Sequence, residues 1–228
     1  MELKGRLKLI ASKVPACDAA CDIGTDHGYI PIYLVQNHIC KRVIAADIKE
    51  GPLTAATDNI RQCNLENSIE TRLGDGLQPI GCGEVDVIVI AGMGGILIKD
   101  ILEKDFDKAK AAKALILQPM NAIEILREWL YKKGFDIYDE ELTSEGEKVY
   151  NVLAAKWTGE RASYDEVFLY IGKKLIEKKD PLLHRYLNKR LAQVEEILEG
   201  LSRSTESNED ILKYEYLKEN YSKLLKDL

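Results

Sequence analysis

The 228-residue sequence contains no apolar run of the roughly 18 residues that a membrane-spanning helix needs, so no span is predicted. It also lacks a C-x-x-C pair, and its five cysteines are scattered between Cys17 and Cys82. With His27, His38 and His184 as the only histidines, a zinc site has too few ligands. We therefore expect reduced thiols, no metal and a cytoplasmic location.

Two common nucleotide-binding motifs are missing as well. The absence of G-x-x-x-x-G-K-[ST] argues against the phosphate-binding loop of an NTPase. Dinucleotide-binding proteins usually carry G-x-G-x-x-G, but the sequence from Asp22 to Gly28 reads D-I-G-T-D-H-G, with Asp26 where a second glycine would lie. A carboxylate at that place repels a pyrophosphate and attracts an ammonium group. The charge therefore favours S-adenosylmethionine over a dinucleotide.

The formal net charge of −6 gives no sign of a nucleic-acid partner, but the basic residues are unevenly distributed. Residues 173–190 hold seven lysines and arginines against two acidic residues, and a second basic cluster lies near residue 1. Both clusters are candidate phosphate contacts; the alternative is that they are solvated helix faces. The candidates are Lys4, Arg6, Lys8 and Lys13 in one cluster and Lys173, Lys174 and Arg190 in the other.

Strand and helix patterns alternate from residue 1 to residue 157. Apolar runs typical of buried strands occur at residues 19–23, 43–47, 69–73, 85–91 and 114–118. Helical patterns occur at residues 3–13, 53–63 and 123–133. This alternation predicts a parallel sheet covered on both faces. Two further strands, at 135–142 and 148–157, predict an antiparallel hairpin, because only T-S-E-G-E lies at their junction. The expected fold is α/β, with a seven-stranded, mostly parallel, Rossmann-like methyltransferase sheet.

The composition changes after Thr158, where the chain becomes rich in Lys, Glu, Leu and Tyr. Apolar residues recur at steps of three and four over residues 183–201 and 214–228, and the polar segment S-R-S-T-E-S-N-E-D separates the two runs. Two helices with one apolar seam each predict an antiparallel coiled-coil hairpin. The predicted domains are therefore a cofactor-binding domain at 1–160 and a helical coiled-coil domain at 161–228.

Acidic residues end three of the expected parallel strands. Asp22 ends the first strand, and Gly24 beside it lets the backbone approach a ligand. Asp47 ends the second strand, where a carboxylate accepts hydrogen bonds from both hydroxyls of a ribose. Asp75, followed by Gly76, ends the third strand and is placed to hold an adenine amine. Helix capping or a simple turn is the alternative role for each carboxylate.

The next two strands end in segments suited to the same pocket. The fourth strand ends in A-G-M-G-G at residues 91–95, and three glycines in four positions favour close approach by a ligand. Met93 packs either on a ligand or in the core. The fifth strand ends in L-Q-P-M, where Gln118 and Met120 are expected to face the crevice.

Taken together, D-I-G-T-D-H-G-Y, A-G-M-G-G, L-I-L-Q-P and R-E-W-L resemble the bacterial tRNA methyltransferases that act on N1 of adenine 22. The resemblance covers essentially the whole chain. It implies a class I methyltransferase domain, S-adenosylmethionine as cofactor, tRNA as partner and a coiled coil that helps to hold the tRNA. One position departs from the family pattern, since Met120 stands where many relatives have asparagine.

The resemblance and the strand ends together give three groups of site residues. The cofactor is expected to contact Asp22, Gly24, Asp47, Ile48, Asp75, Gly76, Ala91, Gly92 and Met93. The transfer site is expected to hold Asp26, His27, Tyr29 and Gly94. The tRNA is expected to contact Lys4, Arg6, Lys8, Gln118, Met120, Lys173, Lys174 and Arg190.

Adenine N1 carries an in-plane lone pair that is unprotonated at neutral pH, so methylation requires its alignment with the methyl carbon and the departing sulfur. No N-P-P-Y-type sequence, often used for exocyclic amines, follows the fourth strand. We expect catalysis by positioning in a monomer, with the base extruded and stacked on Tyr29. The alternatives are a methyltransferase for another RNA or a small substrate, and a cofactor-binding scaffold whose coiled coil recruits a partner.

Overall fold

The computed structural model describes residues 1–161, 163–202 and 208–228. The chain divides into two compact units, Met1–Tyr164 and Asp165–Leu228, whereas the predicted boundary lay at residue 160. Part of the predicted polar segment, residues 203–207, lies outside the described residues. Within the described parts of the chain, no helix has the length and apolar character of a membrane span, and no cluster of three potential metal ligands occurs.

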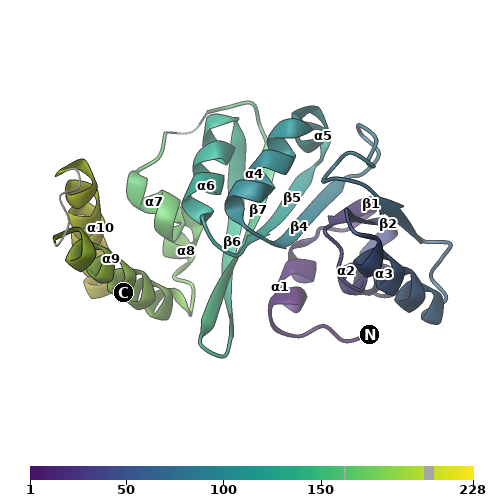
Figure 1. Ribbon diagram of the computed structural model, residues 1–228, viewed down its shortest axis with the longest axis horizontal. Coiled ribbons are helices and arrows are strands. Elements are labelled where there is room, and N and C mark those ends of the chain that lie inside the picture. The colour runs from purple at the N-terminus through teal and green to yellow at the C-terminus, as the bar shows by residue number, and fades with distance from the viewer. Residues whose placement is uncertain (162, 203–207) are drawn as a thin grey trace. The chain divides into compact units, whose positions relative to one another are not determined.

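The first unit is built on a seven-stranded sheet in the order β3-β2-β1-β4-β5-β7-β6 (Figure 1). Its parallel strands are β1 (Cys17–Ile23), β2 (Cys40–Asp47), β3 (Ile69–Leu73), β4 (Val87–Met93) and β5 (Ala114–Pro119). β7 (Lys148–Trp157) runs antiparallel to both β5 and β6 (Phe135–Glu145). This arrangement confirms the predicted methyltransferase-type sheet with its C-terminal hairpin.

Helices cover both faces of the sheet, because side chains alternate between the two faces along each buried strand. On β4, Val87 and Val89 join one core cluster, while Ile88 and Ile90 are buried on the opposite face. The first face is covered by α1 (Gly5–Lys13), α2 (Tyr29–Gln36) and α3 (Glu50–Gln62). The opposite face is covered by α4 (Gly95–Lys104), α5 (Phe106–Ala111) and α6 (Ile123–Lys132) (Figure 1).

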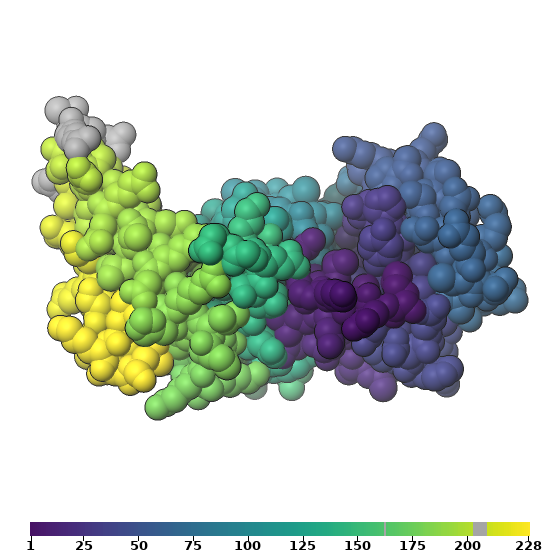
Figure 2. All heavy atoms as spheres, turned by 90° about the horizontal axis from the view of Figure 1, so that it is seen from below, coloured from purple at the N-terminus to yellow at the C-terminus, as the bar shows by residue number. Residues whose placement is uncertain are grey.

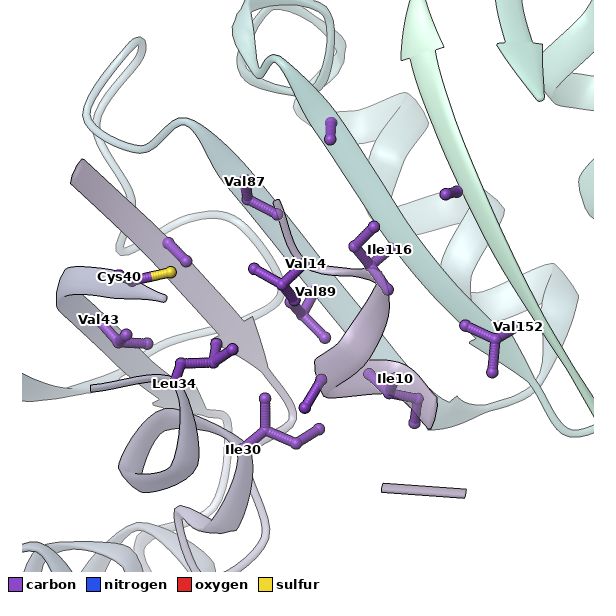
Figure 3. Packing of buried hydrophobic residues seen from close by; sticks show 14 of the residues in the cluster. Ile10, Val14, Ile30, Leu34, Cys40, Val43, Val87, Val89, Ile116 and Val152 are labelled. Carbon is purple, nitrogen blue, oxygen red and sulfur yellow. The ribbon is translucent and has the colours of Figure 1, made fainter. Parts of the chain in front are cut away.

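The N-terminal helix α1 is anchored firmly on the first face. Ile10 of α1 is fully buried, and Val14 at its C-terminal end is nearly so. Both extend toward Val89, Ile116 and Val152 of three different strands (Figure 3). Burial of such side chains contributes about 1.5–3 kcal/mol each, so α1 is an integral part of the domain.

The β6–β7 hairpin is longer than predicted, since β6 continues to Glu145. The N-terminal residues, in purple, lie on the surface beside the teal-green hairpin (Figure 2). Lys13 of α1 forms ion pairs with two acidic residues of β6, at 2.8 Å from Asp139 and with Glu141. This pairing corrects the expectation that Lys13 belongs to a basic surface cluster, because its charge is neutralised within the domain.

The second unit contains two short helices, α7 (Glu166–Ile171) and α8 (Lys173–Lys178), and two long ones, α9 (Leu183–Ser202) and α10 (Asn208–Asp227). α9 and α10 pack against each other. The apolar seam is buried at Leu187 and Val194 of α9 and at Leu217 and Tyr221 of α10. The two long helices agree with the periodic apolar runs, whereas α7 and α8 are too short for periodicity to reveal.

Candidate functional site

A cavity of about 200 Å³ opens at the carboxyl ends of β1 and β4. The strand order reverses at this point, because the chain runs outward from β1 to β3 and then returns to β4 on the other side. Ligands of open α/β sheets bind at such a switch point. The cavity is lined by Arg6, Leu7, Asp22, Gly24, Asp26, Tyr29, Ile30, Ala91 and Gly92.

The turn after β1 takes its shape from left-handed residues. Gly24, His27 and Gly28 have φ angles of 76°, 60° and 68°. The backbone N–H groups of Gly24 and Thr25 donate to the Ala46 carbonyl at 2.8 and 3.0 Å, which fixes the turn to β2. A Cβ atom at Gly24 would overlap Met93 Cε. The D-I-G-T-D-H-G and A-G-M-G-G segments therefore touch, as expected from strand ends that meet at one edge.

Asp22 is the buried acid of this cavity, with 5% of its surface exposed. Burial raises the pKa of Asp22 from 3.8 to about 6, and the negative charge of Asp47 acts in the same direction. The buried Thr25 hydroxyl acts in the opposite direction, because its hydrogen-bonding interaction with the carboxylate lowers the pKa of Asp22, although it makes no hydrogen bond of good geometry among the described residues. A buried carboxylate gains from a bound cationic group with N–H donors.

The acids that end β2 and β3 have different surroundings. Asp47 Oδ1 accepts a hydrogen bond from the Lys49 backbone N–H at 2.8 Å, and Ile48 beside it is 61% exposed, which suits contact with a flat ring. Asp75 Oδ2 lies 2.7 Å from Lys104 Nζ, so a ligand amine would share this carboxylate with a lysine. A Cβ at Gly76 would lie 2.9 Å from Ile101 Cγ2, so packing of α4 explains this glycine better than room for a ring.

Three side chains of the expected transfer site lie at the mouth of the cavity. His27 Nε2 is 3.3 Å from Asp26 Oδ1; the Asp26 side chain is largely exposed and the His27 side chain about half exposed. The His27 and Tyr29 rings are stacked, with centroids 5.3 Å apart and planes 18° apart. The His27 carbonyl accepts a hydrogen bond from Asn59 Nδ2 at 2.9 Å, which holds the strained residue in place. The result is an exposed aromatic pair beside a carboxylate.

Gln118 lies in the wall behind the cavity and is fully buried. Its Oε1 accepts hydrogen bonds from Arg6 Nη1 at 2.6 Å and from the Gly92 N–H at 3.2 Å, and its Nε2 donates to the Pro119 carbonyl at 2.8 Å. The expectation that Gln118 faces the crevice is therefore replaced by a supporting position. Arg6 lies in the same wall, and sequence reasoning had placed it only among the surface phosphate contacts.

The loops after β4 and β5 are tied together beside the cavity. The Met120 N–H donates to the Met93 carbonyl at 2.8 Å, and the Gly95 N–H donates to the Asn121 carbonyl at 3.0 Å. Met120 is 47% exposed at this edge. A Cβ at Gly94 would lie 2.8 Å from Asn121 Oδ1, so Asn121, which the motifs did not single out, borders the transfer site.

The basic candidates divide between the two units. In the first unit, Lys4 and Lys8 are exposed. In the second unit, Glu177 Oε atoms lie 3.7 Å from Lys173 Nζ and 2.8 Å from Lys174 Nζ, and the Arg190 guanidinium lies 5.5 Å from the centroid of the Tyr186 ring. One glutamate thus balances part of the charge that the sequence places on α8.

Comparisons with known proteins agree with this geometry. A family described as a methyltransferase domain matches residues 3–153. The tRNA (adenine(22)-N(1))-methyltransferase of Bacillus subtilis (strain 168) is 38% identical over 93% of this chain and 92% of its own. The crystal structure of the B. subtilis m1A22 tRNA methyltransferase TrmK gives a TM-score of 0.88 at 32% identity, covering 98% of this chain and 99% of that one.

A Streptococcus pneumoniae protein solved in complex with S-adenosyl-L-methionine gives a TM-score of 0.85 at 32% identity, covering 96% of this chain and 98% of that one. The likeness therefore extends over both units of the chain and includes a relative that holds a methyl donor. The chain belongs to the methyltransferase-domain family that includes the tRNA (adenine(22)-N1)-methyltransferases.

Proposed function

We propose that this protein transfers a methyl group from S-adenosylmethionine to N1 of adenine 22 in tRNA. The observation that carries the proposal is the cavity at the switch point of the sheet, which joins Asp22 of β1 to Gly92 of β4. Asp26 and Tyr29 line the same cavity, so a methyl donor held inside would meet a base at its mouth. The choice of adenine 22 as the target rests on the relatives whose names specify this reaction.

The residues present fit S-adenosylmethionine. Asp22, with the Thr25 hydroxyl beside it, suits the amino-acid end of that molecule, since its ammonium group supplies charge and donors. Asp47 suits the ribose hydroxyls, and the exposed Ile48 suits one face of the adenine. When bound, the cofactor supplies a methyl group activated on a sulfonium. Asp75 would contact its adenine amine while sharing Lys104.

The transfer residues act by positioning and by charge. The exposed, stacked rings of His27 and Tyr29 offer a flat surface for an extruded adenine. Methylation leaves a positive charge on the adenine ring, and the Asp26 carboxylate at the mouth favours charge that develops there. Gly92 and Gly94 present backbone without side chains where the two ligands meet. In this mechanism no side chain has to remove a proton, because N1 is already unprotonated.

Contacts with the tRNA backbone come from the exposed Lys4 and Lys8 and from the basic residues of the second unit, Lys173, Lys174 and Arg190. We assign Gln118 and Met120 to the substrate side of the pocket. Gln118 is buried and supports the cavity wall, and Met120 lies at the exposed edge. We place the protein in the cytoplasm, where its tRNA substrate occurs. The proposed form is a monomer.

The test uses purified protein, unmodified tRNA transcripts and labelled S-adenosylmethionine, followed by digestion and mass spectrometry of the nucleosides. The expected product is N1-methyladenosine, and it is absent when adenine 22 is replaced by guanine. A transcript with another adenine replaced serves as the matched control. Cofactor binding without any methylated nucleoside would contradict the proposal and favour a small substrate or a scaffold role.

A further inference from the structure

An irregularity in β4 lies at the wall of the cavity. The pairing register between β4 and β5 shifts between Ala91 and Met93, so Gly92 is an extra residue with φ 80°. A bulged residue loses its regular partner in the ladder, and bulges next to active sites re-aim the chain. The Gly92 N–H donates to the side chain of Gln118 instead of to a strand carbonyl. The amide of Gln118 therefore determines how the Gly92 peptide is held.

Arg6 and the Pro119 carbonyl together set the orientation of that amide, since Gln118 Nε2 donates to the Pro119 carbonyl at 2.8 Å. Gln118 Oε1 lies 2.6 Å from Arg6 Nη1 and 3.2 Å from the Gly92 nitrogen, so two donors converge on one acceptor. A guanidinium group only donates hydrogen bonds. Rotating the amide by half a turn would place its NH₂ group against both donors, which is repulsive. Arg6 thus makes the shortest of the contacts that hold Gln118 in the one orientation that satisfies Gly92.

Arg6 is itself held by residues far away in the sequence. Its backbone N–H, in the first turn of α1, donates to Glu145 Oε1 at 2.8 Å, at the end of β6. Its guanidinium carbon lies 5.6 Å from the centroid of the Tyr150 ring. The burial of Ile10 fixes the rest of α1 on the sheet. These contacts hold the guanidinium at the cavity wall, where it does not extend into solvent as a phosphate contact would.

We propose that Arg6 is a positioning residue for methyl transfer, acting through Gln118 on the Gly92 peptide at the junction of cofactor and base. The proposal rests on the proposed function and deepens it. It assigns to Arg6 an effect on the rate of transfer within the bound complex. A phosphate contact, by contrast, acts on the affinity for tRNA and on its salt dependence.

The two roles separate in single-turnover measurements with cofactor and tRNA both saturating. We expect Arg6→Gln to lower the transfer rate by about tenfold or more, because a misaligned acceptor or donor costs rate and leaves binding largely intact. Arg6→Lys, which keeps the charge and one donor, is expected to recover part of the rate. The tRNA concentration at half saturation and its salt dependence are expected to stay close to wild type.

The coupling between Arg6 and Gln118 gives a second readout that a general loss of stability does not reproduce. Gln118→Glu keeps an acceptor for both donors and loses the donation to the Pro119 carbonyl in either background, but only its carboxylate depends on the cation of Arg6. The change is therefore expected to cost more rate in the Arg6→Gln background than in the wild type. Thermal unfolding of each variant separates folding from positioning, and Arg6→Lys serves if Arg6→Gln is unstable.

Arg61→Gln is the matched control, because Arg61 is an exposed arginine of α3 that pairs with Asp58 at 3.3 Å, away from the cavity wall. A wild-type transfer rate in Arg6→Gln would overturn the proposal. The proposal would also be overturned if Arg6→Gln needed a higher tRNA concentration for half saturation, with a weaker salt dependence and an unchanged rate at saturation. Arg6 would then be a phosphate contact. If the wild type forms no N1-methyladenosine, the proposed function fails and this inference fails with it.

Discussion

Arg127 of α6 and Glu140 of β6 form an ion pair from which water is excluded. Arg127 Nη2 lies 2.7 Å from Glu140 Oε1, and both side chains are 0% exposed. Nearby in α6, Trp129 Nε1 donates to Glu103 at 2.5 Å, and its ring stacks on Phe135 with centroids 5.7 Å apart. The R-E-W-L segment, one of the motifs that carried the family resemblance, therefore supports the fold and lies outside the cavity lining.

Removal of one partner of this pair is expected to destabilise the protein strongly. Arg127→Met leaves Glu140 buried without its cation, which typically costs about 3–5 kcal/mol of unfolding free energy. Urea denaturation monitored by circular dichroism measures the loss. The double variant Arg127→Met/Glu140→Leu removes both charges and is expected to recover much of it.

Lys132→Met is the control for this experiment, because Lys132 forms an exposed ion pair with Glu128 on the same helix. Solvent screens exposed pairs of this kind, so Lys132→Met is expected to leave the unfolding free energy close to that of the wild type. Equal effects of Arg127→Met and Lys132→Met on unfolding would show that burial gives the Arg127–Glu140 pair no special weight.

Most of the sheet could be predicted because buried parallel strands leave an unmistakable apolar pattern. The strand at residues 69–73 was predicted with its observed ends, and the alternation of strands and helices predicted that the sheet is mostly parallel and covered on both faces. The helix predicted from residue 53 begins at Glu50, because Pro52 is tolerated in the first turn, where its missing N–H is not needed. The short helices α7 and α8 carry too little periodicity to be read.

The site could be predicted only where it depends on strand ends. Asp22, Gly24 and Gly92 were expected together because the carboxyl ends of adjacent parallel strands meet at one edge, and the cavity contains all three. The positions of Arg6 and Gln118 could not be read from the sequence. They depend on contacts with Glu145 and Tyr150, which lie about 140 residues from Arg6 along the chain and are brought close only by packing.

The Asp22 carboxylate is expected to lower the stability of the protein while it strengthens cofactor binding. Its folded pKa of about 6 lies above the ordinary 3.8, so the folded protein holds this proton more tightly than the unfolded chain does. The contribution of protonated Asp22 to the unfolding free energy is fully present below pH 4 and is lost as the pH rises through 6. At pH 7.5, Asp22→Asn is expected to raise the unfolding free energy by up to about 3 kcal/mol. Urea denaturation at pH 4, 5, 6 and 7.5 tests this.

The same substitution is expected to weaken binding of S-adenosylhomocysteine, because the carboxylate that attracts its ammonium group is gone. In the wild type, the affinity should fall as the pH drops from 7 to 5 and Asp22 takes up a proton; titration calorimetry measures both effects. Asp18→Asn is the control, since Asp18 is an exposed residue of β1 paired with Lys41. Undiminished affinity in Asp22→Asn would remove Asp22 from the cofactor site.

Gly24→Ala is expected to weaken cofactor binding by about tenfold. Residue 24 has a φ of 76°, and its new Cβ would overlap Met93 Cε. A left-handed conformation costs an L-residue about 1–2 kcal/mol, and the Met93 methyl, at the end of a flexible side chain, would have to move aside at the cavity. Calorimetry with S-adenosylhomocysteine and thermal unfolding give the two readouts. Gly51→Ala is the control, because residue 51 lies in α3 with nothing within 4 Å of a Cβ, and normal binding by Gly24→Ala would contradict the assignment.

Tyr29 is expected to hold the target base by stacking. Tyr29→Ala should lower the single-turnover rate by about fivefold to a hundredfold, because base–aromatic stacking contributes about 1–3 kcal/mol. Tyr29→Phe keeps the ring that stacks on His27 and is expected to retain most of the rate. If Tyr29→Ala transfers the methyl group as fast as the wild type, the base is held elsewhere, and Met120 at the exposed edge becomes the next residue to replace.

The basic residues of the second unit are expected to act on tRNA affinity alone. Replacing Lys173 and Lys174 together by alanine should weaken tRNA binding. A plot of log affinity against log salt concentration should become less steep by about 1–2, because each lost phosphate contact removes roughly 0.9 from the magnitude of its slope. Cofactor affinity should not change, because the cavity lies within the first unit. The double variant Lys223→Ala/Lys226→Ala at the end of α10 removes the same charge and serves as the control. Identical salt slopes for the wild type and the α8 variant would assign these lysines to a solvated helix face paired with Glu177.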